Sequence, residues 1–377
     1  MRIVIDQTVL AKTLARVAGI VERRNTIPII GNVLLAAAPG GFSIAGTDLD
    51  MEATATAAIL VDRPGSCTAP AHTLTDIVKR LAAGAQVELT LDDKSGQLLV
   101  RSGRSKFSLA TLPTEDFPVF GVGDFTCEFE VDSAALAGLI DATRFAISTE
   151  EPRYYLNGSF LHCHGEAMRI TTTDGHRLAV ADTALPAGAA SLPAVIIPKK
   201  AVVEIRKLLD GAPATVSLAV SATKLKITVG ATVLSTKLID GTFPDYQRII
   251  PTANANTLEV DAAELADAVE RVSTISSEKS RAVKLTLDRD EMTVEASSAE
   301  NGQAADSLDP ERARWSGAPL QVGFNARYLL DIIAASGADR LKLAMDDPAS
   351  PCVITDAAAN SDANSADRLF VLMPMRV

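Results

Sequence analysis

The chain has 377 residues and a formal net charge of −11, and that length suits two or three domains, each able to bury its own core. It contains neither the roughly 20 consecutive apolar residues that span a bilayer nor an N-terminal signal peptide, so we expect a cytoplasmic protein without a membrane partner. The acidic charge argues against nucleic-acid binding unless the basic residues gather on one face.

The first predicted element is a helix near the N-terminus that begins in VIDQTVLAKTL, residues 4–14. Apolar residues recur along it in steps of three and four, which is typical of one buried face: Leu10, Leu14, Val17 and Val21. The opposite face repeats the same steps with Lys12, Arg16, Gly19 and Arg23. An ordinary solvated helix face also carries charge, so this pattern alone does not identify a binding surface.

The same elements recur three times along the chain. The segment EVDSAALAGLI at 130–140 returns as EVDAAELADAV at 259–269, and the aspartates that anchor the three copies are Asp6, Asp132 and Asp261, spaced by 126 and 129 residues. A second set of helical segments, LTDIVKRL, VVEIRKLL and LLDIIAAS, repeats with spacings of 128 and 127. We therefore predict three repeated domains, at residues 1–124, 125–253 and 254–377.

Each repeat has a helix, short alternating strands, a second helix and further strands such as VELTL, KLKITV and RLKLAM. This order predicts an α+β fold in which two helices per repeat pack on antiparallel sheets. The second helices also contain several basic residues, among them Lys79, Arg80, Lys199 and Lys200. An acidic protein with basic helices can still present a positive surface to DNA.

An enzyme and a metalloprotein are the main alternatives. Asp174 and His176 could pair as a base and its orienting carboxylate, but no nucleophile elbow, P-loop or dinucleotide motif accompanies them. The segment His162-Cys163-His164 predicts an exposed strand face rather than a metal site, and the four cysteines predict buried free thiols. We expect no catalysis, no metal and no cofactor.

Several segments together resemble the bacterial DNA polymerase III beta subunit, the sliding clamp. They are IPIIGNVLL at 27–35, GTDLDME at 46–52, RSGRSKFSLATLP at 101–113, RYYLNG at 153–158, TDGHRLAV at 173–180, FPDYQRI at 243–249 and MPMR near the C-terminus. The resemblance implies a DNA clamp fold, closed into a head-to-tail homodimeric ring with helices lining the hole. It implies a non-catalytic processivity factor that encircles duplex DNA and tethers the replicative polymerase; the alternative is a non-catalytic structural scaffold of repeated domains.

The resemblance also implies which residues face DNA. Contacts would be sequence-independent and directed at phosphates. The candidates are Arg24, Lys12, Arg16, Arg80, Lys199, Lys200, Tyr154 and Tyr155. Packing at the start of a strand is an equal alternative for the two tyrosines.

The segment SKFSLATL at 105–112 predicts a strand at a sheet edge, with Phe107 and Leu109 on one face. The resemblance implies that the third domain of a second subunit covers this edge, near Ile275. The alternative is that both side chains fill the core of their own domain.

The chain ends in the apolar run LFVLMPMRV, residues 369–377. We predict that Leu369 to Leu372 form a last strand and that the final five residues stay outside the sheet and line a groove for short peptides. Such peptides would come from the polymerase III catalytic subunit, the clamp loader, and other polymerases and repair proteins. By resemblance the groove comprises Leu156, Thr173, Gly175, His176, Arg177, Leu178, Pro244, Arg248, Ile249, Val371, Met373, Pro374, Met375 and Arg376.

Overall fold

The structure is a computed structural model that describes residues 1–121, 123–276, 281–289, 291–357 and 368–376. The chain folds into two compact units. The first comprises Met1–Ala134, Pro186–Pro193 and Lys200–Leu238, and the second comprises Ala135–Leu185, Ala194–Lys199 and Ile239–Val377. Residues of the middle predicted repeat therefore contribute to both units.

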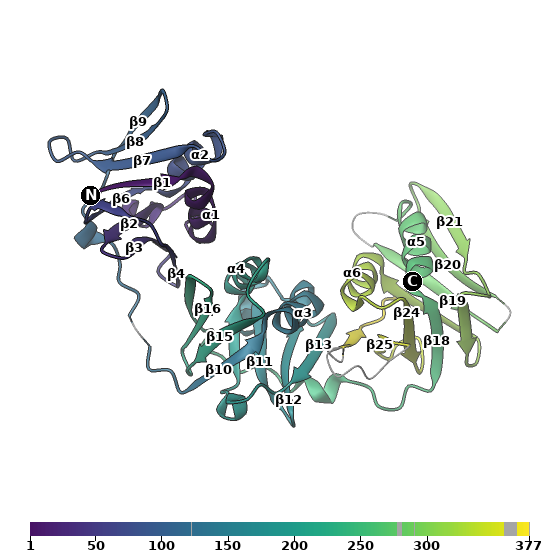
Figure 1. The fold of residues 1–377 in the computed structure, drawn as a ribbon. Coiled ribbons are helices and arrows are strands. Elements are labelled where there is room, and N and C mark those ends of the chain that lie inside the picture. The colour runs from purple at the N-terminus through teal and green to yellow at the C-terminus, as the bar shows by residue number, and fades with distance from the viewer. Residues whose placement is uncertain (122, 277–280, 290, 358–367, 377) are drawn as a thin grey trace. The chain divides into compact units, whose positions relative to one another are not determined.

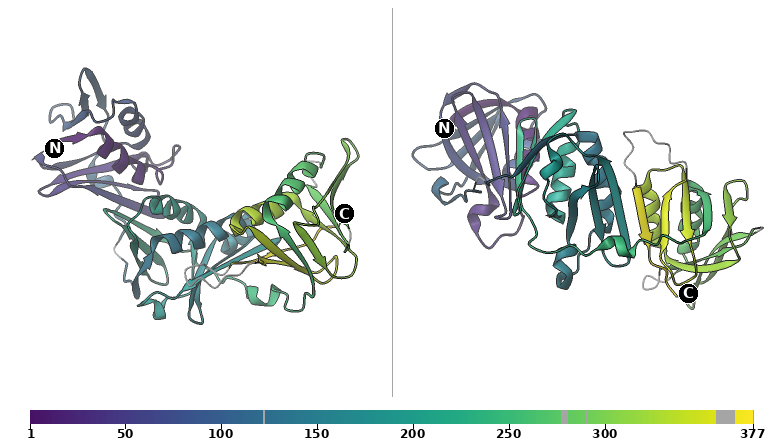
Figure 2. Two further views of the ribbon diagram at one scale, coloured as in Figure 1. Left: turned by 45° about the vertical axis from the view of Figure 1, so that its right-hand side comes forward. Right: turned by 90° about the horizontal axis from the view of Figure 1, so that it is seen from below.

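The α-helices of the described residues come in three successive pairs along the chain (Figure 1). They are α1 (Gln7–Ala18), α2 (Ala71–Arg80), α3 (Ser133–Thr143), α4 (Lys199–Leu209), α5 (Ala262–Ser273) and α6 (Ala326–Ser336). In the first unit α1 packs against α2, and in the second unit α5 packs against α6, as both views of Figure 2 show. The prediction of two helices per repeat is confirmed.

The repeated aspartates mark the starts of helices. The Asp6 carboxylate accepts a hydrogen bond of 2.8 Å from the backbone N–H of Thr8 at the start of α1, and Asp261 accepts one of 3.0 Å from Glu264 at the start of α5. Asp132 directly precedes α3. Because the first N–H groups of a helix have no partner within it, a capping aspartate is favoured there, and the repeat preserves it.

The apolar face predicted for the first helix is confirmed. Leu10, Leu14 and Val17 are fully buried. The helix ends at Ala18, so Val21 is buried from the turn that follows rather than from the helix.

The first unit contains two antiparallel sheets. The larger has the order β10 (Cys127–Asp132), β15 (Thr215–Val220), β16 (Lys224–Val229), β17 (Thr232–Lys237), β4 (Met51–Ala57), β3 (Gly41–Thr47), β2 (Asn32–Ala38) and β6 (Gly65–Pro70). The smaller has the order β5 (Val61–Arg63), β1 (Arg2–Asp6), β7 (Gln86–Leu91), β8 (Leu98–Ser102) and β9 (Ser105–Leu109). The prediction that residues 105–112 contain an edge strand is confirmed, because β9 ends its sheet.

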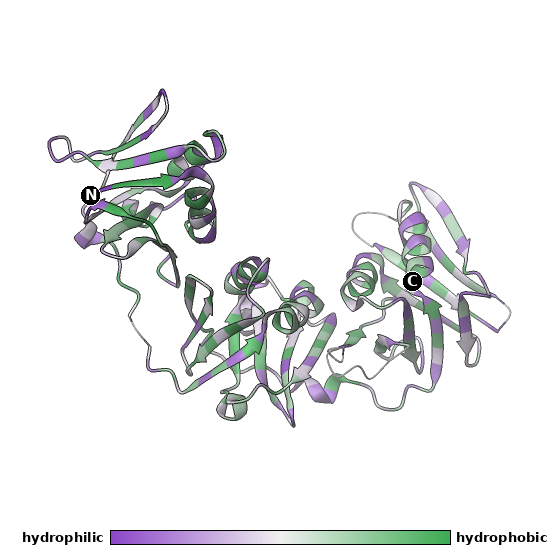
Figure 3. Ribbon diagram, viewed as in Figure 1, coloured by the Kyte–Doolittle hydropathy of each residue, from purple (hydrophilic) through white to green (hydrophobic). Residues whose placement is uncertain are grey.

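The second unit also contains two antiparallel sheets. The larger has the order β14 (Val195–Pro198), β11 (Gly158–His164), β12 (Ala167–Thr173), β13 (Arg177–Ala184), β26 (Arg368–Leu372), β25 (Cys352–Asp356), β24 (Arg340–Met345), β18 (Asn256–Asp261) and β22 (Ala313–Ser316). The smaller has the order β21 (Gly302–Ser307), β20 (Met292–Ser298), β19 (Ala282–Leu287) and β23 (Leu320–Asn325). Along strands such as β7 and β18, hydrophobic and hydrophilic residues alternate (Figure 3), as expected for sheets with one buried face.

Two strand pairs join neighbouring repeats through backbone hydrogen bonds. Within the first unit, β4 pairs with β17 over Met51 to Ala55. Within the second unit, β13 pairs with β26 over Arg177 to Ala181. Each larger sheet therefore continues from one repeat into the next, which explains why three repeats give only two compact units.

Candidate functional site

The basic residues expected at the DNA surface of the first unit are mostly exposed. Lys12 on α1, Arg24 after it and Arg80 at the end of α2 are exposed. Arg16 is half-buried, and its Nη1 donates a hydrogen bond of 2.8 Å to the carbonyl of Leu208 at the end of α4. Arg16 therefore links two helices in addition to carrying charge.

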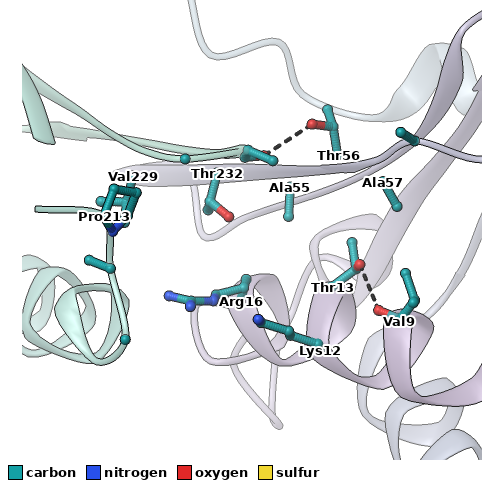
Figure 4. A pocket seen from close by; sticks show the side chains of 15 residues that line it. Val9, Lys12, Thr13, Arg16, Ala55, Thr56, Ala57, Pro213, Val229 and Thr232 are labelled. Atoms are coloured by element: carbon teal, nitrogen blue, oxygen red, sulfur yellow. Dashed lines mark hydrogen bonds between the residues drawn. The ribbon is translucent and has the colours of Figure 1, made fainter. Parts of the chain in front are cut away.

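Lys12 and Arg16 border a cavity of about 320 Å³ (Figure 4). In Figure 4 both side chains extend from α1 in the same direction. The other walls consist of β4 residues and two turns, and they contribute alanine, glycine, valine, proline and threonine but no acidic residue. In a chain of net charge −11, this is a local region of positive potential, the arrangement that allows an acidic protein to attract phosphate.

The two adjacent lysines at the start of α4 have different environments. Lys200 Nζ contacts Asp48 Oδ2 at 2.5 Å and Glu22 Oε1 at 3.0 Å. Burial lowers the pKa of Lys200, but the hydrogen bonds to Asp48 and Glu22 outweigh burial and raise that pKa overall. Lys199 is exposed and has no ion pair in the part of the chain that the structure describes. Lys199 is thus available to a phosphate, whereas the charge of Lys200 is already neutralised.

The two tyrosines divide between the two alternatives. Both belong to the 3₁₀ segment η4 (Glu151–Leu156), where their rings meet edge to face with centroids 5.8 Å apart. Tyr154 is 54% exposed, whereas Tyr155 packs against buried apolar side chains. The Tyr154 side chain is therefore exposed to solvent, and the Tyr155 side chain is half-buried.

The second unit brings the predicted peptide-groove residues together from distant segments. Leu178 on β13 and Val371 on β26 are direct cross-strand partners. Both belong to one apolar cluster, which we call the groove cluster: Leu156, Leu178, Val180, Ile196, Phe243, Tyr246 and Val371. Next to it the 3₁₀ segment η6 (Tyr246–Ile249) carries two further predicted residues, Arg248 and Ile249.

The surface above the groove cluster combines exposed and half-buried side chains. Ile249 is 43% exposed, and Arg248, His176 and Arg376 are exposed as well. The tail residues from Met373 to Met375 are half-buried. Exposed isoleucine and flexible methionine side chains are both typical of surfaces that accept several partners.

The predicted last strand is confirmed as β26, which ends at Leu372, and residues 373–376 lie outside that strand as predicted. Two of them nevertheless form backbone hydrogen bonds. The Met373 N–H donates to the His176 carbonyl at 2.9 Å, and the Met375 N–H donates to the Gly323 carbonyl at 2.8 Å. Val377 lies outside the described residues. The tail is therefore a fixed part of the surface.

Arg177, one of the predicted groove residues, is held by several contacts within its own chain. It is only 9% exposed, and its guanidinium donates to Asp174 at 3.0 Å, to Asp331 on α6 at 2.6 Å and to the Phe145 carbonyl at 2.8 Å. It also lies 4.3 Å from the centroid of the Tyr328 ring. Because each of its three guanidinium nitrogens donates a hydrogen bond, Arg177 fastens the 174–177 turn to α6.

Two further expectations are corrected. His162 was placed on an exposed strand face, but it is 8% exposed and lies under η6, because Phe160, Phe243 and Tyr246 cover it. Cys163 is half-buried rather than buried, while the other three thiols are buried as predicted.

The sequence reasoning overlooked several residues behind this surface: Phe145, Arg169, Asp182, Tyr246, Tyr328 and Asp331. One signal was available for Arg169, because it is the single charged residue of β12 and a buried arginine needs an acidic partner. Its partner Asp182 is the cross-strand neighbour on β13.

Comparisons with known proteins cover the whole chain. Models of the DNA polymerase III beta subunit match its N-terminal domain over residues 1–121, its central domain over 130–245 and its C-terminal domain over 247–376. Beta sliding clamps of Caulobacter vibrioides and Escherichia coli are 44% and 37% identical over the full length of both chains. A crystal structure of the sliding clamp of Bartonella birtlesii bound to griselimycin is 41% identical, covers 100% of both chains and has a TM-score of 0.94.

Replacing Arg177 should destabilise the second unit. We expect Arg177→Met to lower the free energy of unfolding by about 2 to 3 kcal/mol, because the carboxylates of Asp174 and Asp331 would lose a charged partner. Chemical denaturation measures this. The matched control is Arg248→Met, whose side chain is 85% exposed and should cost less than about 1 kcal/mol. Equal losses in the two variants would contradict the role given to Arg177.

Proposed function

The chain belongs to the DNA polymerase III beta subunit family, and we propose that two copies close head to tail into a ring around duplex DNA. The chain is a DNA sliding clamp and has no catalytic role of its own. We assign its three domains to residues 1–124, 125–253 and 254–377, and its location to the cytoplasm. The ring confers processivity because a closed ring cannot leave DNA sideways, so it tethers a polymerase while sliding.

The observation that carries this proposal is a pair of complementary sheet edges. Strand β9 ends one sheet of the first unit, and strand β21 ends one sheet of the second. The hairpin at residues 98–109 holds three basic residues and no acidic residue, whereas the hairpin at 292–307 holds three acidic residues and no basic residue. Glu295 and Asp306 already pair with Lys284 and Arg271 in the same chain, which leaves Glu300 as the acid without an ion pair among the described residues. Opposite charges favour pairing of β9 in one copy with β21 in the other. A head-to-tail contact of this kind closes into a ring when two copies complete the rotation.

The side chains at these edges support the same arrangement in part. Phe107 is 37% exposed on β9, the last strand of its sheet. A second subunit that paired with β9 would bury this side chain. Leu109 is only 8% exposed, which assigns it to the core of its own domain instead. Ile275 is half-buried after α5, in the unit that also carries β21.

Disrupting the edge should give a folded monomer. We expect Phe107→Asp to shift the protein from dimer to monomer in sedimentation, because the charge cannot be buried in an apolar contact. Leu109 should not be replaced in this test, because a charge in the core would unfold the domain. A dimer of unchanged stability would contradict the assignment of β9.

DNA inside the ring would be bound through phosphates alone. Lys12, Arg24, Arg80 and Lys199 are the exposed cations that we assign to this role, and Tyr154 provides one exposed ring. Hydrogen bonds to bases would fix the ring at one place, so weak and sequence-independent binding suits sliding.

The two lysines of α4 should respond differently to substitution. Lys199→Glu should weaken DNA binding and reduce the slope of log K against log salt by about one, because the protein would neutralise one phosphate fewer. Lys200→Met should instead lower thermal stability, because Glu22 and Asp48 would no longer share a cation. Titrations at several salt concentrations, together with melting curves, measure both effects. If the salt slope of Lys199→Glu equals that of the unmodified protein, Lys199 contacts no phosphate and is simply a solvent-exposed residue of the helix.

We further propose that the groove cluster and the tail bind short linear peptides of the polymerase III catalytic subunit, the clamp loader, and other polymerases and repair proteins. A leucine or aromatic anchor would enter between Ile249 and the tail methionines. A dimer has two such surfaces, so two partners can share one ring.

Shortening the tail side chains tests this surface without removing its backbone hydrogen bonds. Met373→Ala with Met375→Ala should abolish binding of the polymerase catalytic subunit and of the loader in surface plasmon resonance. Deletion of residues 373–377 should have the same effect with an additional loss of stability, because the bond from Met375 to Gly323 goes with it. Normal binding by either variant would refute the peptide surface.

A further inference from the structure

A chain of buried polar side chains lies directly behind η6 in the second unit. Tyr246, the first residue of η6, is 3% exposed. Its hydroxyl oxygen lies 3.0 Å from His162 Nε2 and 3.2 Å from Arg169 Nη1. Arg169 in turn forms two hydrogen bonds with the Asp182 carboxylate, at 2.6 and 2.5 Å. The groove cluster therefore rests on a polar network as well as on apolar contacts.

One of these hydrogen bonds has a fixed direction, and the direction of the other depends on the tautomer of the His162 ring. A guanidinium can only donate, so the Tyr246 oxygen accepts from Arg169. The Tyr246 hydroxyl proton is then free to be donated to His162 Nε2, which requires that nitrogen to be unprotonated. Burial lowers the pKa of His162 to about 4, so the ring is neutral near pH 7 and can accept.

The network is built on three neighbouring strands. His162 on β11 is the cross-strand partner of Arg169 on β12, and Arg169 is the partner of Asp182 on β13. Cross-strand partners project from the same face of a sheet. The side chains of Arg169 and Asp182 are 14% and 16% exposed, so the arginine charge is compensated where it is largely shielded from water.

A second attachment holds the same segment of chain. The Phe160 ring stacks on His162 with centroids 4.3 Å apart, and Phe243 stacks on Phe160 at 4.7 Å with the planes only 4° apart. Phe243 and Tyr246 thus fasten the segment to the sheet at two points three residues apart. Pro244, Arg248 and Ile249, which we assign to the peptide surface, lie between and just beyond these points.

The other polar contacts that the structure describes for η6 are exposed, among them one of 3.4 Å between Gln247 Nε2 and His164 Nδ1. The segment η6 has four residues, and a 3₁₀ turn of that length has poor intrinsic stability. No side chain caps its start. The ion pair between Asp245 and Arg248 is highly exposed and contributes little. The position of the segment therefore depends on its buried residues.

We propose that Tyr246 is a positioning residue for the peptide surface: its hydroxyl, held between Arg169 and His162, fixes η6 and with it Pro244, Arg248 and Ile249. The inference rests on the proposed function of this surface. It assigns a binding role to a residue that touches no ligand. Removing the hydroxyl would leave the buried donor of Arg169 and the acceptor of His162 without a partner, and η6 would shift or loosen to admit water.

The test uses the full-length protein and griselimycin, the ligand named for the Bartonella birtlesii clamp. We expect Tyr246→Phe, which keeps the ring, to weaken binding by about 3- to 10-fold, the effect of one hydrogen bond. Amide exchange by mass spectrometry should rise in residues 243–250. The matched control is Thr286→Val, which removes a hydroxyl hydrogen bond of 3.2 Å to Glu295 in the other sheet of the same unit and should leave both readouts unchanged.

A second pair of variants separates positioning from general destabilisation. His162→Gln keeps a neutral acceptor and should bind close to the unmodified protein, whereas His162→Leu removes the acceptor and should resemble Tyr246→Phe. Binding by Tyr246→Phe within twofold of the unmodified protein, with unchanged exchange at 243–250, would overturn the inference alone. Binding of the polymerase III catalytic subunit that survives Met373→Ala with Met375→Ala would instead refute the peptide surface, and the inference with it.

Discussion

Antiparallel strand pairing across the repeat boundaries is the interaction on which the rest of this structure depends. A single repeat would expose sheet edges with unpaired backbone groups, and such edges associate with other chains. Within the first unit β4 pairs with β17, and within the second β13 pairs with β26, so each internal boundary is closed by hydrogen bonds. Among the described residues, the edges at β9 and β21 have no neighbouring strand, and their charges are opposite. In the proposed ring, pairing of β9 with β21 would extend the same interaction to a second copy.

The distribution of charge follows from this architecture. Some cations are used to hold repeats together, as Arg16 and Lys200 are in the first unit. Others, such as Lys12 and Lys199, are exposed on helices and free to meet phosphate. The excess of acid elsewhere discourages binding of DNA to other surfaces, so a chain of net charge −11 can act on DNA.

Features set by local pattern could be predicted from the sequence, and features set by distant partners could not. Repeat spacing predicted the helix pairs, and alternation at Phe107 predicted the edge strand. The sequence predicted the same role for Lys199 and Lys200, because Asp48, the ion-pair partner of Lys200, lies 152 residues away in the chain. Arg177 and His162 looked accessible because η6, α6 and the residues that cover them come from other parts of the chain. Motif resemblance predicted the residues of the proposed peptide surface but gave no sign of the polar network behind it.

The central claim is that the protein holds DNA by enclosing it rather than by affinity. The most direct measurement is the lifetime of the loaded protein on a closed circular duplex at high salt, before and after a single cut linearises that DNA. The account predicts a long lifetime on the circle that hardly changes with salt, since screening weakens phosphate contacts but does not open a ring. It predicts rapid loss from the linear form by sliding off the ends. Equal lifetimes on circular and linear DNA would contradict it.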